Sequence, residues 1–562
     1  MPAIDCSPGG CWPLYISAGR HLFKHAVRRL AFGVWRLAFG VWRLAFGVRR
    51  SAFANPHRPR PRPRKCGQAG LHRFLSRGSL EGSRFLAWQL YQVAAGGSRE
   101  PPSVWQFYRL HLDALRPDSD HIFPPIVLPL TLHSSSRQTY ATLTDTLNTK
   151  ITMHPTTSST SKNGPAFSKP RLDRMHQVLS GYIERKEMPG LVALVSHHDD
   201  VHIETLGTLA FNQSAPMRTD TIFRIASLAK PVTAVAAMIL LEECKLRLDE
   251  SIEPWIPELA NRQVLKSLSG PLDDTVPARR PITVRDLLTF RMGFGSVMAP
   301  PDTYPIQKLI REYQIGGDGP PRPSQAPTAE KWLQRLSSLP WMVQPGERWL
   351  YHMSSDVLGI LISRVAEQSL GTFMRERIFD PLGMKDTAFY VAPEKIHRLP
   401  ACYFFNQEKK ELDLFDDAAN SAWGSPPPSE SAGGGLVSTI DDYFAFYRML
   451  LNQGRHSEVQ IVSRTAVELM TSDQLTPEQR VGAELFFGNF SSWGFVMSVD
   501  IRRDDLFHNP GRFGWTGGLG TTAYTDPAEN MIGMLFTQRL MDSPEPPKVF
   551  NDFWTLAYAA LV

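Results

Sequence analysis

A serine and a lysine that stand three residues apart, Ser227 and Lys230, are the side chains of this sequence best suited to covalent chemistry. If Ser227 opens a helix, both residues share one face, and the hydroxyl and the amino group lie close together. A helix N-terminus also presents unpaired N–H groups and a partial positive charge, which favour an oxyanion. A buried lysine can release its proton and activate a serine nucleophile. The S-x-x-K spacing alone has low specificity, because it also describes a helix with a capping serine and an exposed lysine.

The surroundings of this pair favour the catalytic interpretation. A strand-like segment, 221–224 (TIFR), precedes it, and 231–243 (PVTAVAAMILLEE) is apolar around nearly its whole circumference, as a buried helix is. Further motifs follow in order at 281–288 (PITVRDLL), 345–351 (PGERWLY), 379–384 (FDPLGM) and 433–439 (GGGLVST). With this ordered set the chain resembles, over roughly residues 170–562, the superfamily of serine β-lactamases, penicillin-binding proteins and family VIII carboxylesterases.

The resemblance gives Tyr351 the place of the family's catalytic tyrosine. A phenol beside a lysine ammonium is stabilised as phenolate, so Tyr351 and Lys230 would share the task of taking the proton of Ser227. The alternative is a core tyrosine whose hydroxyl is simply hydrogen-bonded. The family's β-lactamases have Tyr-x-Asn here, whereas this chain has YHM at 351–353. The missing amide favours the carboxylesterase branch over β-lactam or peptide-like substrates.

The resemblance also assigns the strand that lines the site to a Gly-Trp-Thr-Gly-Gly run ending at Gly518. Trp515 stands where the β-lactamases have the lysine of Lys-Thr-Gly, so an aromatic wall replaces a charge that would hold a substrate carboxylate. Thr516 and Gly517 complete the motif as substrate-binding positions. The N–H groups of Gly518 and Ser227 would form the oxyanion hole, each donor contributing roughly 10²–10³ in rate. Alternatively, the glycines only let the strand approach a neighbour closely.

Two further side chains, Trp423 and His508, are candidate substrate contacts. His508 is close in sequence to the motif strand, although a lone histidine is more often a surface residue. Trp423 belongs to residues 419–435, which together with the Pro- and Gly-rich residues 300–327 are the expected loop walls of the pocket. The sequence has no G-x-S-x-G elbow, no H-E-x-x-H and no cysteine cluster with zinc spacing. No metal and no cofactor is therefore implied.

Patterns of apolar residues predict the elements that carry these side chains. Strands are predicted at 191–197, 201–209, 521–525 and 531–537, and helices at 171–186, 284–289, 329–337, 355–368, 440–452 and 549–561. Strands at both ends with helices between them predict an α/β protein of the α+β type. One antiparallel sheet is flanked by helices and joined to a mostly helical lobe, as in β-lactamases and transpeptidases.

The N-terminal part differs from the rest in composition. The first 150 residues hold 21 Lys+Arg against 7 Asp+Glu, which leaves 40 against 48 for the remainder. The net charge of +6 thus averages two unlike pieces and does not indicate a nucleic-acid-binding face. Residues 29–48 repeat RLAFGVW, and 58–64 alternate Arg and Pro. We expect a disordered segment or an incorrectly assigned start, with a transit segment or a folded domain as alternatives.

The chain is accordingly divided into a basic, low-complexity segment (1–152), a flexible leader (153–168) and a catalytic domain (169–562). No apolar run reaches the eighteen or so residues that span a membrane. The five cysteines form no recognisable framework, which favours a reduced compartment. We expect a cytoplasmic location, or an organellar one if the N-terminus is a transit segment.

These features predict a serine hydrolase or acyltransferase that acts on a small-molecule carboxylic ester or acyl-thioester through an acyl-Ser227 intermediate. Proteins with this resemblance include esterases, lactonases, β-lactamases and acyltransferases of natural products. The alternatives are a β-lactamase or peptidase-like hydrolase, a binding module of the same fold, and a nucleic-acid or membrane-surface protein acting through the basic N-terminus. We expect neither nucleic acid nor a membrane span, and no oligomeric state is indicated.

Overall fold

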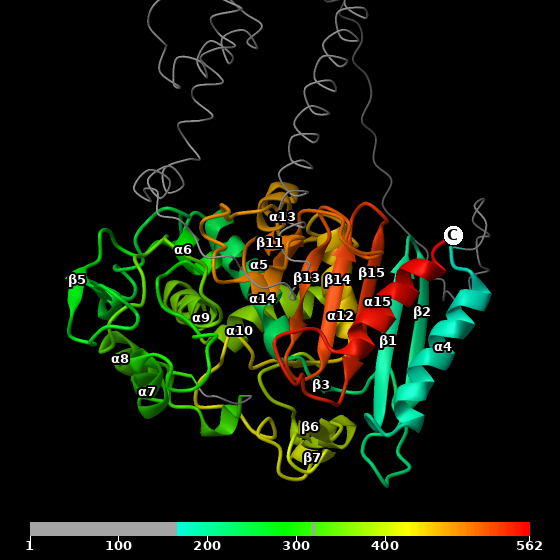
Figure 1. Ribbon diagram of the computed structural model, residues 1–562. Coiled ribbons are helices and arrows are strands. Elements are labelled where there is room, and N and C mark those ends of the chain that lie inside the picture. Colours follow the sequence, from blue (N-terminus) through cyan, green and yellow to red (C-terminus); the bar gives the residue numbers. More distant parts are fainter. Residues whose placement is uncertain (1–165, 317–320) are drawn as a thin grey trace, which may run out of the picture. The chain divides into compact units, whose positions relative to one another are not determined.

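The computed structural model describes residues 166–316 and 321–562 (Figure 1). The basic segment expected at 1–152 lies outside the described residues. Only the last three residues of the expected leader are described, and one of them, Phe167, forms an antiparallel bridge with Leu561. Contact with the C-terminal end of the chain thus begins ahead of the first described helix. No helix in the described part of the chain is long and apolar enough to cross a membrane.

A seven-stranded sheet forms the centre of the domain. In spatial order its strands are β11 (Ser491–Trp493), β12 (Ser498–Asp500), β13 (Phe513–Gly517), β14 (Thr521–Asp526), β15 (Met531–Thr537), β1 (Gly190–His197) and β2 (Asp200–Gly207). Every neighbouring pair is antiparallel. Strands from the two ends of the domain meet where Leu191 of β1 lies opposite Thr537 of β15. The predicted antiparallel sheet is confirmed.

Helices cover the sheet and build a second lobe between β2 and β11. The helices are α4 (Lys169–Glu184), α5 (Ala229–Glu242), α6 (Val284–Leu288), α7 (Pro305–Glu312), α8 (Ala329–Ser337), α9 (Met353–Ala366), α10 (Leu370–Met374), α11 (Asp380–Leu382), α12 (Ile440–Leu451), α13 (Arg464–Met470), α14 (Glu484–Phe487) and α15 (Lys548–Ala560). Short 3-10 helices lie at η1 (Ala226–Leu228), η2 (Pro257–Leu259), η3 (Pro323–Gln325) and η5 (Pro393–Arg398), and a short π-helix lies at η4 (Arg375–Phe379). Two-stranded pairs join β3 (Phe223–Arg224) to β8 (Val437–Ser438), β4 (Gln263–Leu265) to β5 (Thr275–Pro277), β6 (Cys402–Asn406) to β7 (Glu411–Asp416), and β9 (Arg455–His456) to β10 (Val459–Gln460).

Both faces of the sheet are buried, as the alternation along β1 shows. Val192 and Leu194 belong to a large core that includes α5 and α12. Leu191 and Val195 belong to a second core with α4 and α15, which lie side by side over the other face (Figure 1). Successive residues of a strand point to opposite faces, so a fully apolar strand predicts cover on both sides.

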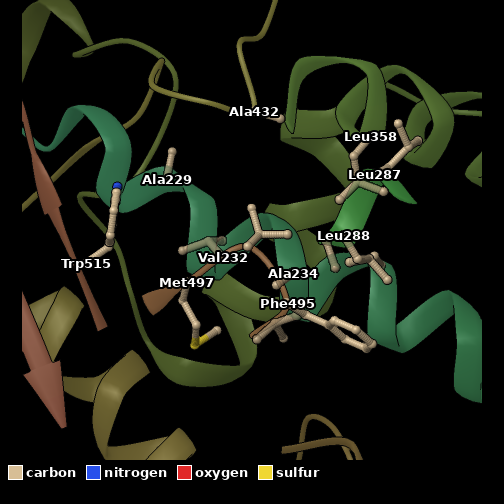
Figure 2. Close-up of a cluster of buried hydrophobic side chains, with 14 of the residues drawn as sticks. Ala229, Val232, Ala234, Leu287, Leu288, Leu358, Ala432, Phe495, Met497 and Trp515 are labelled. Carbon is tan, nitrogen blue, oxygen red and sulfur yellow. The ribbon is translucent and has the colours of Figure 1, made fainter. Parts of the chain in front are cut away.

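Helix α5 is the buried axis of the larger core. Its residues are fully or almost fully buried from Ala229 to Leu240. Side chains from α6, α9, β13 and the segment before β12 gather around it (Figure 2): Leu287, Leu288, Leu358, Trp515, Phe495 and Met497. A helix that is apolar on every side has to be surrounded in this way, and the prediction of a buried helix here is confirmed.

The expectation of a loop over 300–327 is wrong in part, because α7 lies within it. Pro305 occupies the first turn of α7, where its missing N–H costs least. The side chain of Gln307 accepts the backbone N–H at the helix start. The Pro and Gly residues on either side concealed a short helix whose apolar residues Ile306 and Ile310 are buried.

Candidate active site

Ser227 lies in the single turn η1 between β3 and α5, and not in the first turn of α5 as expected. The residue before it, Ala226, has φ +46°, in the left-handed region that side chains other than glycine rarely adopt. Neighbours hold this turn: the carbonyl of Ile225 accepts the Thr521 hydroxyl at 3.1 Å, and the Tyr443 hydroxyl donates to the carbonyl of Leu228 at 2.6 Å. Such strained backbone persists only where surrounding contacts enforce it, and it is common at active sites.

Lys230, in the first turn of α5, has no exposed surface. Its Nζ lies 3.0 Å from Ser227 Oγ, as the S-x-x-K spacing predicts. It also donates to the carbonyl of Gly433 at 2.6 Å and lies 3.2 Å from His352 Nδ1. The same Nζ stands 4.7 Å from the ring centroid of Tyr351. The amino group is therefore surrounded by hydrogen-bonding partners and an aromatic face.

The hydroxyl of Tyr351 lies 2.9 Å from Ser227 Oγ, on a different element from Lys230. Trp515 Nε1 donates to the same Tyr351 oxygen at 2.9 Å. The sequence predicted Trp515 as an aromatic wall, and the structure adds a second role that the sequence did not reveal. An N–H aimed at a phenol oxygen stabilises the phenolate form, because hydrogen bonds to charged groups are the stronger ones.

The remaining motif positions, on β13 and directly after it, differ in what they contact. Thr516 and Gly518 line the same cleft as Ser227. A Cβ at Gly517 would stand 2.3 Å from the carbonyl oxygen of Ile225, so this glycine allows β13 to approach the segment before the serine. For Gly517, the alternative interpretation given above therefore applies: the glycine lets the strand approach a neighbour closely. Gly518 has open space where a side chain would be, beside the cleft.

Two clefts meet at Ser227, and Tyr351 and His352 line both of them. One, of about 710 Å³, is rich in aromatic side chains, among them Phe486 and Trp515. The other, of about 1100 Å³, lies between α7, α8, α9 and residues 427–431. Both segments expected as pocket walls contribute to this larger cleft. An ester bound at Ser227 thus has room on two sides of its carbonyl.

Trp423 is not a substrate contact, which corrects the expectation. Its side chain has no exposed surface. Its Nε1 donates to the carbonyl of Gly435 at 3.0 Å, and the guanidinium of Arg224 stands 5.5 Å from its ring. An aromatic residue in a pocket-wall segment can also face the core and hold the wall in place. Trp423 does so through its burial and its hydrogen bond to Gly435.

His508 lines the smaller cleft, as expected. Its ring stacks on Phe490 with centroids 3.8 Å apart. Burial, together with the charge of Arg512, lowers the pKa of His508 to about 4, so the ring is neutral at pH 7. Its Nδ1 has no hydrogen-bond partner among the described residues.

His352 is a site residue that the sequence did not reveal. Its Nδ1 faces Lys230, and its Nε2 lies 3.4 Å from Asp356 Oδ2. Its removal from bulk water and the Lys230 charge lower the pKa of His352 to about 4, although 34% of the side chain faces the clefts. The sequence signal was a histidine next to the motif tyrosine with an aspartate four residues on, the spacing of one helix face.

Asp356 connects this histidine to the loop before β8. Its Oδ1 accepts from the hydroxyl of Ser431 at 2.8 Å and from the N–H of Gly433 at 3.1 Å. A Cβ on Gly433 would lie 2.6 Å from Ser355 Oγ and 2.8 Å from His352 Cε1. The glycine therefore permits the close packing of loop, histidine and aspartate around the lysine.

Comparison with known proteins agrees with this geometry. The family model Beta-lactamase matches residues 175–550. The chain belongs to the beta-lactamase family. Protein Rv1367c of Mycobacterium tuberculosis is 36% identical over 369 residues, covering 63% of this chain and 87% of that protein. A lovastatin esterase of Penicillium rubens is 27% identical over 345 residues, covering 58% and 82%.

A solved structure shows the same fold as this beta-lactamase-family chain. EstCE1, described as a hydrolase with promiscuous acyltransferase activity, superposes with a TM-score of 0.58 at 22% identity, covering 69% of this chain and 99% of EstCE1. Esterases and acyltransferases recur among the relatives. The predicted fold class and the prediction of a serine esterase or acyltransferase of the β-lactamase-like superfamily are confirmed.

Proposed function

We propose that Ser227 is the nucleophile of a small-molecule ester hydrolase or acyltransferase, with Lys230 and Tyr351 as its base. One observation carries the proposal: Ser227 Oγ lies within hydrogen-bond distance of Lys230 Nζ, at 3.0 Å, and of Tyr351 Oη, at 2.9 Å. A nucleophile held between two groups that can exchange its proton is the arrangement that acyl transfer needs.

In the proposed mechanism the Ser227 oxygen attacks the ester carbonyl while its proton passes to Tyr351 or Lys230. The N–H groups of Ser227 and Gly518 hold the resulting oxyanion. The ester C–O bond then breaks, and the departing alcohol oxygen takes up the transferred proton. Water or an acceptor alcohol then attacks the acyl-Ser227 carbonyl and gives its proton to Tyr351 or Lys230. The bond to Ser227 breaks, the serine oxygen takes up that proton, and the acyl group is released.

The substrate class follows from the walls of the two clefts. Trp515 and Phe486 offer apolar surface beside the nucleophile, and the lysine that would hold a carboxylate is replaced by Trp515. An uncharged ester with an apolar acyl group is therefore favoured over a β-lactam. The lovastatin esterase among the relatives, whose name gives lovastatin as the substrate of an esterase, supports the choice of an ester. The larger cleft leaves room for an acceptor alcohol.

A substrate panel tests the preference. Short p-nitrophenyl esters should be turned over with a higher kcat/KM than a chromogenic cephalosporin. Efficient cephalosporin hydrolysis with poor ester turnover would reverse the choice of substrate class. Adding a primary alcohol and measuring the product ester against the free acid separates acyl transfer from hydrolysis.

A further inference from the structure

We propose that His352 is a positioning residue of the acyl-transfer site, which accepts a hydrogen bond from Lys230 and thereby orients the amino group toward Ser227. The inference deepens the proposed function and rests on it. It assigns a role to His352, which stands at the unspecified middle position of the family's Tyr-x-Asn motif.

Among the described residues, the lysine nitrogen has three hydrogen-bonding neighbours: Ser227 Oγ at 3.0 Å, the Gly433 carbonyl at 2.6 Å and His352 Nδ1 at 3.2 Å. A carbonyl oxygen can only accept, so one N–H of Lys230 points to Gly433. As a neutral amine, Nζ has one more hydrogen and a lone pair. If that hydrogen goes to His352, the lone pair is left facing the serine oxygen, which is the orientation of a base.

The same contacts also suit Lys230 after it has taken the proton. The ammonium has three hydrogens and three acceptors, namely Ser227 Oγ, the Gly433 carbonyl and His352 Nδ1. Both protonation states are thus held in one geometry, so the proton transfer requires no rearrangement of the amino group. Without the imidazole, one hydrogen of a fully buried amino group would lose its partner.

For this role Nδ1 of His352 must carry no proton, and its neighbours favour that form. The titratable groups that face the ring are Lys230 on α5, Tyr351 beside it and Asp356 on α9. The pKa of His352 lowered to about 4 keeps the ring neutral at pH 7. Its single proton is favoured on Nε2, 3.4 Å from the Asp356 carboxylate, which leaves Nδ1 as the acceptor.

The backbone of His352 is held in a conformation that few side chains adopt. With φ +91° and ψ −60° it is close to the rare γ-turn region of positive φ. Its carbonyl accepts from the Ser355 N–H at 3.0 Å and from the Ser355 hydroxyl at 2.5 Å, at the start of α9. Backbone strain maintained at one residue of an active site indicates that the position of its side chain matters.

The test uses a fluorophosphonate probe and p-nitrophenyl butyrate on the full-length protein. The probe reports on Ser227 directly: its oxygen bonds to phosphorus, the P–F bond breaks, fluoride leaves, and the serine proton goes to Lys230 directly or through Tyr351. The main variant is His352→Gly, because glycine tolerates the positive φ. In His352→Asn the amide oxygen occupies the place of Nδ1. The control is His397→Asn, at an exposed histidine in η5.

We expect His352→Gly to slow both labelling and kcat by roughly 10²-fold, the contribution typical of a positioned acid–base group, with little change in KM. His352→Asn should retain most of the rate, and His397→Asn should equal the wild type. Added imidazole should restore the His352→Gly rate in a saturable manner, since the emptied space opens to both clefts. Nitrogen-15 NMR of labelled histidines should show His352 with its proton on Nε2 at pH 7.

Several results would overturn the inference. One is labelling of His352→Gly at the wild-type rate. Another is a slow His352→Gly variant that imidazole does not rescue and that melts below the wild type, because this would indicate a structural role only. A wild-type protein that the probe does not label at Ser227 would instead contradict the proposed function itself, so the two failures are distinguishable.

Discussion

At the oxygen of Tyr351 two hydrogen bonds converge, one shared with Ser227 and one donated by the indole of Trp515. The indole N–H offers the phenolate a partner without adding a charge to the cleft. The pocket wall is therefore aromatic at this position, where the family's β-lactamases have a charged lysine.

Trp515→Phe removes the N–H and keeps a smaller aromatic ring on the pocket wall. We expect kcat for a p-nitrophenyl ester to fall by about tenfold to a hundredfold, as the loss of a hydrogen bond to a charged group predicts, while KM changes little. Steady-state kinetics check this. A rise in KM with unchanged kcat would mean that Trp515 acts only as a wall.

Lys230 and Tyr351 should behave as one proton-transfer unit. Lys230→Met, which keeps the buried volume, and Tyr351→Phe should each lower kcat by roughly 10²–10⁴. The double variant should be little slower than the slower single variant, because residues that act together show non-additive losses. Multiplicative losses in kcat would show that the two residues act independently.

The site residues could be predicted only in part from the sequence. The sequence predicted Ser227, Lys230 and Tyr351 from their types and their place in an ordered set of motifs, and the structure brings the three side chains together. His352 was missed because its direction depends on a positive φ, which the sequence does not reveal for a histidine. Trp423 was misjudged, since whether an aromatic residue faces a cleft or the core depends on tertiary packing.

At the scale of elements, the loop before β8 completes the site by bringing Gly433 against the start of α9. Its carbonyl accepts from Lys230, and its N–H donates to Asp356. The loop thus links α5, which carries Lys230, to α9, which follows Tyr351. Close approach is essential, because no side chain fits at this glycine.

Gly433→Ala should therefore disturb the site, since its Cβ would stand 2.8 Å from His352 Cε1. We expect a large loss of kcat and slower fluorophosphonate labelling, with the protein still folded. The matched control is Gly270→Ala in the β4–β5 turn, where the nearest atom would be 3.3 Å away. Equal activity of the two variants would contradict the packing described for the loop.

The elements were predicted more completely than the site. Strands β1 and β15 and the apolar helix α5 were predicted well, because almost every residue of each is buried and the sequence there is nearly continuously apolar. The turn η1 was not foreseen, since the same small and apolar residues are compatible with a helix that starts at Ser227. Helix α7 was hidden by the prolines and glycines around it.

For the whole molecule, the boundary of the enzyme is a prediction of its own. The predicted catalytic motifs lie after residue 220, and residues 166–168 already contact residues 560–562 at the C-terminal end. A protein that starts at Met153 should hydrolyse esters and melt like the full-length chain. One that starts at Lys169 should melt at a lower temperature, because it loses the Phe167 bridge to Leu561 and the Ser168 bond to Ala560. Loss of activity on removal of residues 1–152 would contradict this boundary.

The central claim is that an acyl group resides on Ser227 during turnover. Intact-mass spectrometry after brief incubation with a p-nitrophenyl ester, followed by peptide mapping, measures it directly. The account predicts one added acyl group, located on the peptide that contains Ser227 and absent from Ser227→Ala, which should also lose ester turnover. Full turnover by Ser227→Ala, or an acyl group located on another residue, would contradict it.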